Sequence, residues 1–336
     1  MDANKRRSWV LRRRPTGAPR ASDFELIEES VPAPQSGEVV TRTLFLSIDP
    51  YMRGRLSDRK SYAPSVQIGE VMTGETVGEV IASADPRCAV GDIVVGARGW
   101  QTHSVTPAER LVRVERNGPP VSTYLGVLGM PGTTAYSGMK DIGQPKAGET
   151  VVISAASGAV GSVAGQLAKR AGARVVGVAG GPDKCLFVQE TLGFEECVDH
   201  RMMDLKAALA AACPQGIDVY FENVGGALQA AVFEQLNPFA RMVMCGMVAH
   251  YNDVEPRPGP SLMPVVMKRL RIEGLIVSDK PERFAEWRKL ATPWVVEGSL
   301  KYREDLYQGL EAAPEALAGI LEGRNFGKVL VEVAQL

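Results

Sequence analysis

With 336 residues, 45% of them hydrophobic, the chain exceeds the size of one ordinary core and predicts two globular domains. Its 38 basic and 39 acidic residues nearly cancel, so no overall charge recruits nucleic acid or an anionic membrane. No apolar segment is long enough to span a bilayer, and none follows the early basic residues as in a signal peptide, so we expect a cytoplasmic protein without membrane partners.

The first third of the chain has the pattern of an all-β, barrel-like half. From Trp9 to about Val121, short alternating apolar segments are separated by Pro and Gly. The strands predicted on this pattern are 9–11, 39–45, 77–81, 91–96 and 111–114. The segment 327–333 is too apolar for a free terminus, and we expect it to return to this half as a further strand.

Beyond Gly126, helices alternate with strands, which predicts a parallel, doubly wound sheet. Six strands are predicted: 150–154, 174–179, 196–199, 217–222, 240–245 and 272–277. The predicted helices are 131–141, 161–171, 184–192, 204–212, 227–236 and 281–297.

The turn after the first of these strands is suited to hold a pyrophosphate. It reads A-x-x-G-x-x-G, with Ala155, Gly158 and Gly161 at the fixed positions. Ala155 stands where the dinucleotide fingerprint usually has its first glycine. Its glycines allow close approach of backbone to ligand, and the following helix directs N–H groups and its positive dipole end at an anion. The strand 174–179 follows at the distance that a strand–helix–strand unit requires.

The end of the second strand favours a phosphorylated ribose. No carboxylate that would bind ribose hydroxyls follows Ala179; Asp183 comes after a proline and best suits a helix N-cap. Lys184, with Arg201, would pair with a 2′-phosphate and favour NADPH over NADH. The alternative is that Lys184 is an ordinary solvated lysine.

Several other side chains are interpreted as packing groups. The five cysteines form no C-x-x-C pair, which predicts neither a structural zinc site nor disulfides. Gly165 is interpreted as a close-packing site in the helix. Three of the cysteines are expected to be small buried apolar groups: Cys185, Cys197 and Cys245. Five methionines are expected in the core or in the lining of a pocket: Met242, Met244, Met247, Met263 and Met267.

Four longer motifs give the chain a family resemblance. They are 49–55 (DPYMRGR), 129–136 (GMPGTTAY), 222–226 (ENVGG) and 325–328 (NFGK). With these motifs the chain resembles the zinc-free branch of the medium-chain dehydrogenase/reductase superfamily, and within it the NADPH-dependent prostaglandin, alkenal and curcumin reductases. The resemblance implies a GroES-like β-barrel catalytic domain, 1–128 completed by 298–336, and a Rossmann NADPH-binding domain, 129–297.

The resemblance also implies site residues. It places the pyrophosphate at Gly158, Ala159, Val160 and Gly161, and the 2′-phosphate at Lys184. It places the adenosine, ribose and nicotinamide at Asn223, Cys245, Gly246, Met247, Tyr251, Leu275, Ile276, Val277 and Asn325. Where some relatives have a tyrosine at the 2′-phosphate, this chain has His200, which pairs with phosphate when it is protonated.

The zinc motif of the superfamily is missing. Zinc enzymes of the superfamily carry a four-cysteine lobe and a Gly-His-Glu motif, whereas the corresponding segment here reads Gly74-Glu75-Thr76. The three histidines do not suggest a catalytic base either: His103 is expected in a polar loop, and His250 neighbours Tyr251. We therefore expect chemistry without a metal.

Reduction of an activated C=C bond requires a proton donor for the enolate, and a phenol meets that need at neutral pH. The resemblance places Tyr51, Tyr62 and Tyr251 around the substrate. Tyr62, in the loop segment Ser61-Tyr62-Ala63-Pro64, is the first choice as acid; Tyr251 is an alternative donor, and Tyr51 is expected to contact substrate. For each tyrosine, simple packing is the competing interpretation.

The sequence therefore predicts an NADPH-dependent reductase of α,β-unsaturated aldehydes and ketones, with a small conjugated carbonyl compound as substrate. Two alternatives stay open: a zinc-free NADPH quinone oxidoreductase, and a non-catalytic NADPH-binding protein. The apolar fifth and sixth strand regions of the second half predict a homodimer.

Overall fold

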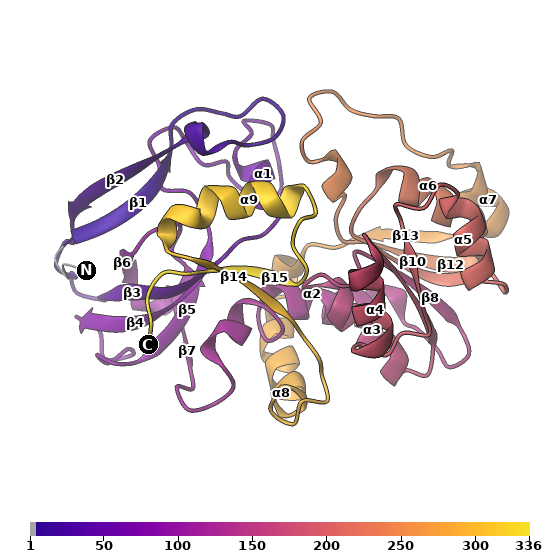
Figure 1. The fold of residues 1–336 in the computed structure, drawn as a ribbon. Helices are drawn as coiled ribbons and strands as arrows, with labels where there is room; N and C mark the ends of the chain where they lie inside the picture. Colours follow the sequence, from indigo (N-terminus) through magenta and orange to yellow (C-terminus); the bar gives the residue numbers. More distant parts are fainter. Residues whose placement is uncertain (1–4) are drawn as a thin grey trace. The chain divides into compact units, whose positions relative to one another are not determined.

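The computed structural model describes residues 5–336 and divides them into two compact units (Figure 1). The first unit comprises the described residues up to Gly126 together with Glu304–Leu336, and the second unit is Val127–Arg303. In the described part of the chain no helix has the length and apolar character needed to cross a membrane.

The first unit is built on β-strands, as the sequence predicts. A two-stranded antiparallel sheet pairs β1 (Lys5–Leu11) with β2 (Phe24–Ser30). The larger sheet has the order β14-β15-β3-β4-β5-β7, and β6 also pairs with β3. Its members are β3 (Glu38–Ser47), β4 (Glu75–Ser83), β5 (Ile93–Ala97), β6 (His103–Pro107), β7 (Val112–Val114), β14 (Glu304–Gln308) and β15 (Lys328–Glu332).

Strand β3 organises this unit because it pairs along its length with β4, β6 and β15. Its pairing with β4 shifts register between Val40 and Thr41 and again between Thr43 and Phe45, which are irregularities of the kind that bend a strand. The antiparallel pairing of β15 with β3 confirms that the segment 327–333 returns to the first half. Helix α9 (Ala313–Leu321) buries Ala316 and Leu317 in the same core.

The second unit holds a six-stranded parallel sheet in the order β10-β9-β8-β11-β12-β13. Numbered along the chain, this order is 3-2-1-4-5-6, which is that of dinucleotide-binding sheets, and it reverses between β8 and β11. The predicted fold class is confirmed. The strands are β8 (Thr150–Ser154), β9 (Arg174–Ala179), β10 (Glu196–Asp199), β11 (Ile217–Glu222), β12 (Leu236–Met244) and β13 (Arg271–Gly274).

Helices connect these strands. They are α2 (Met130–Ser137), α3 (Gly161–Arg170), α4 (Pro182–Glu190), α5 (Leu205–Ala212), α6 (Gly226–Gln235), α7 (Met263–Lys268) and α8 (Glu282–Val296), while the short α1 (Met52–Arg55) belongs to the first unit. Helix α5 begins at an N-cap, Asp204, whose carboxylate accepts the N–H of Ala207 at 2.9 Å.

Gly165 is a close-packing site, as the sequence indicates. A methyl group built at Gly165 would lie 1.8 Å from the ring of Phe194, which is buried against helix α3. The absence of a side chain therefore lets α3 approach the segment that leads into β10.

We expect Gly165→Ala to lower the free energy of unfolding by about 1–3 kcal/mol, because the buried ring of Phe194 must move. Urea unfolding measures this. Gly259→Ala is the matched control, since a methyl group there meets nothing within 4 Å. Equal midpoints for the two variants would contradict the packing argument.

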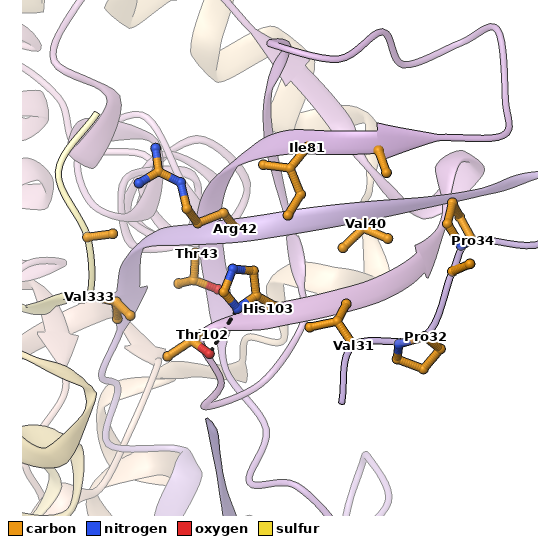
Figure 2. A pocket seen from close by; sticks show the side chains of 13 residues that line it. Val31, Pro32, Pro34, Val40, Arg42, Thr43, Ile81, Thr102, His103 and Val333 are labelled. Atoms are coloured by element: carbon orange, nitrogen blue, oxygen red, sulfur yellow. Dashed lines mark hydrogen bonds between the residues drawn. The ribbon is translucent and has the colours of Figure 1, made fainter. Parts of the chain in front are cut away.

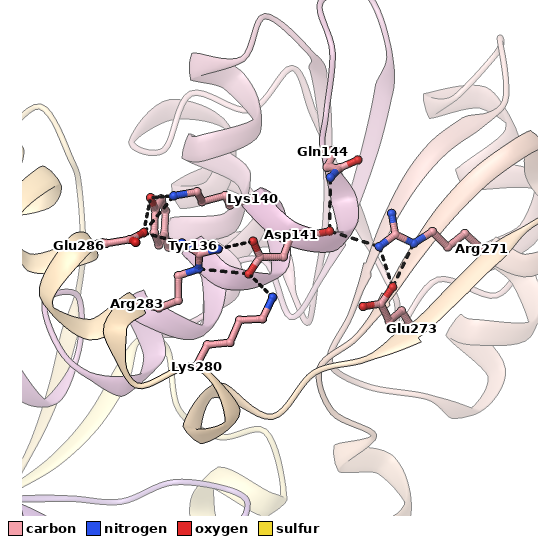
Figure 3. A network of polar contacts seen from close by, with 9 residues as sticks. All are labelled: Tyr136, Lys140, Asp141, Gln144, Arg271, Glu273, Lys280, Arg283 and Glu286. Carbon is pink, nitrogen blue, oxygen red and sulfur yellow. Dashed lines mark hydrogen bonds and ion pairs between the residues drawn. The ribbon is translucent and has the colours of Figure 1, made fainter.

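A polar network joins the region after α2 to α8 in the second unit (Figure 3). The Asp141 carboxylate accepts hydrogen bonds from Arg283 Nη2 at 2.7 Å and from Lys280 Nζ at 3.1 Å. Glu286 accepts from Lys140 at 2.9 Å and from Arg283 at 2.6 Å. Burial raises the pKa of Asp141, but the hydrogen bonds and charges of Arg283 and Lys280 outweigh it and hold that pKa below its ordinary value.

We expect Asp141→Asn to lower the free energy of unfolding by about 1–2 kcal/mol near neutral pH. Because the pKa of Asp141 is lower in the folded protein, its stabilisation is complete above the unfolded pKa of about 3.9 and is lost as the pH falls through the folded value. The difference between the two proteins should therefore shrink below about pH 4. Urea unfolding at a series of pH values tests this, and a constant difference down to the lowest pH would contradict it.

The structure corrects four expectations. The predicted helix 131–141 is α2 followed by a π-helical turn, Gly138–Gly143, and the strand predicted at 272–277 ends at Gly274. His103 was expected in a polar loop but is buried in β6, because its segment pairs with β3. Met263 and Met267 were expected in the core or in the lining of a pocket; α7 exposes 62% and 67% of their surfaces, so they do not belong to the core, and only the pocket alternative stays open.

Candidate functional site

The turn between β8 and α3 is tightly folded. Ala155, at the position of the usual first glycine, has a φ of +49°, a left-handed conformation that glycine adopts more readily. A methyl group at Gly161 would lie 2.4 Å from the Ala155 carbonyl oxygen. Gly161 therefore lets α3 begin directly against the turn, and Gly158, Ala159 and Val160 remain partly exposed before it.

The ends of β8 and β11 are joined at the point where the sheet order reverses. The Asn223 amide Nδ2 donates to the Ser154 carbonyl at 2.8 Å, and the Asn223 backbone N–H donates to the Ser154 hydroxyl at 2.7 Å. That hydroxyl also lies 3.0 Å from Oε1 of Glu222, which accepts the Val224 N–H at 2.7 Å. Asn223 thus has a fixed position at the edge where ligands of such sheets bind.

The end of β12 is attached to the same place. The backbone N–H groups of Cys245 and Gly246 donate to the Glu222 carbonyl at 2.9 and 3.0 Å. Burial, with Glu222 adding to it, raises the pKa of the Cys245 thiol to about 12, so the thiol stays protonated and unreactive at neutral pH. A methyl group at Gly246 would lie 3.1 Å from the Tyr251 hydroxyl, which places this phenol beside the turn.

His250 has a structural role in this region. Its Nε2 accepts the Gly226 N–H at 3.0 Å at the start of α6, and its Nδ1 lies 3.0 Å from a carboxylate oxygen of Asp253. Since Nε2 is an acceptor, the proton is on Nδ1 and the ring is neutral in this arrangement. The sequence interpretation that His250 is no catalytic base fits these contacts.

The segment after β13 is also attached to the end of β12. Leu275, which leads into Ile276 and Val277, donates its N–H to the Met244 carbonyl at 3.0 Å.

Two basic side chains lie over the end of β9. A methyl group built at Gly180 would lie 2.8 Å from His200 Nε2, and one at Gly181 would lie 3.2 Å from Arg201 Nη1. Asp199 Oδ1 accepts the N–H groups of both Gly181 and Arg201, at 2.9 and 3.0 Å. The two glycines thus provide the space that the basic side chains occupy.

The prediction that Asp183 is an N-cap is wrong. Gly181, with a φ of +97°, is the N-cap of α4, and Pro182 takes the first helical position, where a missing N–H costs nothing. Asp183 and Lys184 therefore lie in the first turn of α4. Lys184 is partly buried there, three residues after Gly181.

In the first unit, Tyr51 and Tyr62 are brought together by Arg55. The guanidinium carbon of Arg55 lies 4.4 Å from the ring centre of Tyr62 and 5.5 Å from that of Tyr51. Tyr62 exposes 60% of its surface. Burial raises the pKa of the Tyr51 phenol well above its ordinary value, and Asp49 and Glu75 add to the effect. The phenol of Tyr51 therefore remains a hydrogen-bond donor at neutral pH.

Asn325 lies in a turn that is tied to the same segment. Its Nδ2 donates to the Gly327 carbonyl at 2.9 Å. The buried Lys328 Nζ donates to the Ile48 carbonyl at 2.8 Å and to Asp49 Oδ1 at 3.0 Å. The C-terminal NFGK motif and the DPY motif are thus neighbours within the first unit.

A separate hollow of about 680 Å³ lies on the sheet of the first unit (Figure 2). Its wall contains apolar side chains such as Val31 and Ile81, together with Arg42 and His103. The His103 Nδ1 lies 3.1 Å from the Thr102 hydroxyl, and burial lowers the pKa of this imidazole. The candidate cofactor and substrate residues do not line this hollow.

The residues present do not fit a zinc ion. Across residues 5–336, no group of three or more His, Cys, Asp or Glu side chains is placed to hold a metal. At the catalytic zinc motif of the superfamily, Glu75 and Thr76 stand where zinc enzymes have histidine and glutamate.

The sequence interpretation missed Arg55 and the pair Ser154–Glu222. Arg55 follows Tyr51 by four residues, and in a helical turn that spacing puts two side chains on one face, so the signal was available. Glu222 was noted only as part of a strand end, and nothing in the sequence indicates that its carboxylate is buried beside Ser154.

Comparisons with known proteins show the family of the chain. Residues 7–114 match the family described as the N-terminal domain of oxidoreductase, and residues 159–297 match the family described as zinc-binding dehydrogenase. The chain is 48% identical to the NADPH-dependent curcumin reductase of Escherichia coli (strain K12), across 98% of this chain and 97% of that protein.

Two further comparisons point the same way. The chain is 41% identical to the NADP⁺-dependent 2-alkenal reductase of Nicotiana tabacum, across 97% of each chain. It is also similar to the crystal structure of CurA in complex with NADPH from Vibrio vulnificus. That match has a TM-score of 0.94 and 46% identity, and it covers 98% of this chain and 100% of that one.

Proposed function

Because the chain belongs to the NADP-dependent oxidoreductases of the medium-chain dehydrogenase/reductase superfamily, in the group of curcumin, alkenal and prostaglandin reductases, we propose that it reduces the C=C bond of α,β-unsaturated aldehydes and ketones with NADPH. The observation that carries the proposal is the arrangement at the carboxyl edge of the parallel sheet. There a tight glycine turn, basic side chains and the Asn223 turn adjoin one another along neighbouring strands.

The second unit has the features that NADPH requires. The turn from Gly158 to Gly161 would hold the pyrophosphate at the start of α3. Lys184, Arg201 and a protonated His200 would pair with the 2′-phosphate, since the glycines at 180 and 181 leave the end of β9 to basic groups. Asp199, the nearby carboxylate, already accepts two backbone N–H groups.

Further positions would hold the rest of the cofactor. Asn223, the run Cys245–Gly246–Met247 and Tyr251 lie at the linked ends of β11 and β12, and residues 275–277 follow β13. Asn325 is the contribution we assign to the first unit. When bound, NADPH supplies the hydride.

The protein's own part in the reaction is to bind the carbonyl oxygen and to supply a proton. A phenol does both, because it donates a hydrogen bond to the oxygen that becomes negative during reduction and holds a proton for transfer. We assign the acid to Tyr62, whose exposed phenol is available to a ligand, with Tyr251 as the alternative donor. Tyr51, whose raised pKa keeps it protonated, would hydrogen-bond the substrate.

NADPH consumption by the purified protein against a graded series of enones, with product analysis, tests the proposal. Formation of the saturated carbonyl product is the expected result. Oxidation of NADPH with quinones alone would instead favour the quinone oxidoreductase alternative. Tight NADPH binding without turnover on either class would favour a non-catalytic binding protein.

We also propose a homodimer formed through the edge of the second unit. Strand β13 is the last strand of the sheet order, so in the described chain one of its edges has no strand partner. Beside it, Leu262, Met263, Val266 and Met267 expose between 62% and 74% of their surfaces. An unpaired edge next to exposed apolar side chains is suited to pair with a second copy across a two-fold axis.

Light scattering should accordingly give twice the mass of one chain. Ile272→Lys, on β13, is expected to shift the protein to monomers because it places a charge at the paired edge. Val296→Lys on α8, at an apolar position that is more exposed than Ile272, is the control and should leave the mass unchanged. A monomeric unmodified protein would overturn the dimer.

A further inference from the structure

Arg55 ends the short helix α1 and is buried, although it carries a charge. Its guanidinium carbon lies within 5.5 Å of the ring centres of both Tyr51 and Tyr62. The distance of 4.4 Å to the ring centre of Tyr62 places the cation directly on the aromatic face. A cation on the negative face of an aromatic ring is attractive, and more so when water is partly excluded.

Arg55 also fixes the backbone on either side of this contact. Its Nη1 donates to the Ala63 carbonyl at 3.0 Å, directly after Tyr62. Its own carbonyl accepts the Val66 N–H at 2.9 Å. Arg55 therefore contacts the ring of Tyr62, the carbonyl of the next residue and Val66, where the loop around Pro64 ends.

We propose that Arg55 is the positioning residue that holds Tyr62 in place. This inference rests on the proposed function, in which Tyr62 is the acid. The exposed Tyr62 would otherwise sample several rotamers, and a donor that is out of place by about 1 Å loses much of its effect. A guanidinium suits the task because it is flat enough to stack between two rings while its fork donates to a carbonyl in the plane. An ammonium group has no flat surface with which to stack on a ring.

Arg55→Met removes the charge and the donor but keeps an extended side chain. We expect kcat for enone reduction to fall by about 10-fold or more, with the KM for NADPH and its Kd unchanged within about twofold. Arg55→Lys keeps the charge without the fork and should restore less than half of the lost kcat. Arg53→Met is the matched control: Arg53 is equally buried in α1, but its Nε donates to the Gly17 carbonyl.

A double-mutant cycle separates positioning from general damage. If Arg55 acts through Tyr62, Arg55→Met should change kcat by less than about twofold in a Tyr62→Ala background. An equal loss in both backgrounds would overturn the proposal, as would a loss of the same size in Arg53→Met.

Hydrogen exchange gives a readout that does not depend on turnover. Faster exchange over residues 61–66 in Arg55→Met, but not in Arg53→Met, is the expected result. Unchanged exchange in Arg55→Met would overturn the proposal even if the protein reduces enones. If the unmodified protein reduces no enone, the proposed function fails, and the exchange experiment still decides whether Arg55 holds the loop.

Discussion

Replacing Tyr62 by phenylalanine is expected to lower kcat for enone reduction by about 10²-fold, which is the usual loss when a general acid is removed. The variant removes only the hydroxyl, so the ring can keep its place on the Arg55 guanidinium, 4.4 Å away. The Kd of NADPH should remain within about twofold, because the proposed cofactor positions next to the glycine turn are untouched. Steady-state kinetics with a soluble enone and a separate NADPH titration measure the two effects.

Tyr51→Phe and Tyr251→Phe are the matched controls, since each also removes one phenol hydroxyl. We expect Tyr51→Phe to raise the KM of the enone more than it lowers kcat, in keeping with a binding role. If Tyr62→Phe retains full kcat and Tyr251→Phe loses it, the acid is Tyr251 and the assignment to Tyr62 is wrong.

The second large effect is expected from Lys184→Ala. A hydrogen bond to a charged group contributes about 1.5–3 kcal/mol, so the KM for NADPH should rise by about 10- to 100-fold. NADH lacks the 2′-phosphate, and its KM should stay nearly constant. The preference for NADPH over NADH should therefore fall by the same factor, as measured by kcat/KM for both cofactors with one enone.

Lys206→Ala is the control for the loss of a positive charge in the same unit, because Lys206 is exposed on α5 and pairs with Glu234. It should leave both KM values unchanged. Equal use of NADH and NADPH by the unmodified protein would contradict the assignment of Lys184. If only Arg201→Ala loses the preference for NADPH, Arg201 rather than Lys184 is the side chain that binds the 2′-phosphate.

Regular apolar periodicity allowed much of the second unit to be predicted. Strands β9, β10 and β11 have the bounds expected from the sequence, since a buried parallel strand is a continuous apolar run between turn residues. The π-helical turn after α2 and the early end of β13 were not predictable, because apolar side chains continue in the sequence beyond the last residue of α2 and beyond the last residue of β13. Strand β14 and helix α9 were overlooked, although α9 has a clear apolar face.

Local motifs made part of the candidate site predictable. The glycine turn was recognised from spacing, but not that Ala155 adopts the conformation usually left to glycine. The contacts of Arg55 depend on where the loop around Tyr62 folds back, and the buried state of Glu222 depends on its partner on β8. Such contacts come from tertiary packing, and the spacing of residues in a single sequence does not indicate them.

The discontinuity of the first unit has a consequence for biosynthesis. Its central strand β3 cannot pair with β15 until β15 has been translated. Likewise, Asp49 meets Lys328 only after about 280 further residues have been added to the chain. Val127–Arg303 is contiguous and is free to fold on the ribosome while the remaining segment is still being made. Nascent chains that have not yet exposed residues 304–333 therefore present an unfinished β-sheet, whose unpaired strand edge is open to pairing with other chains.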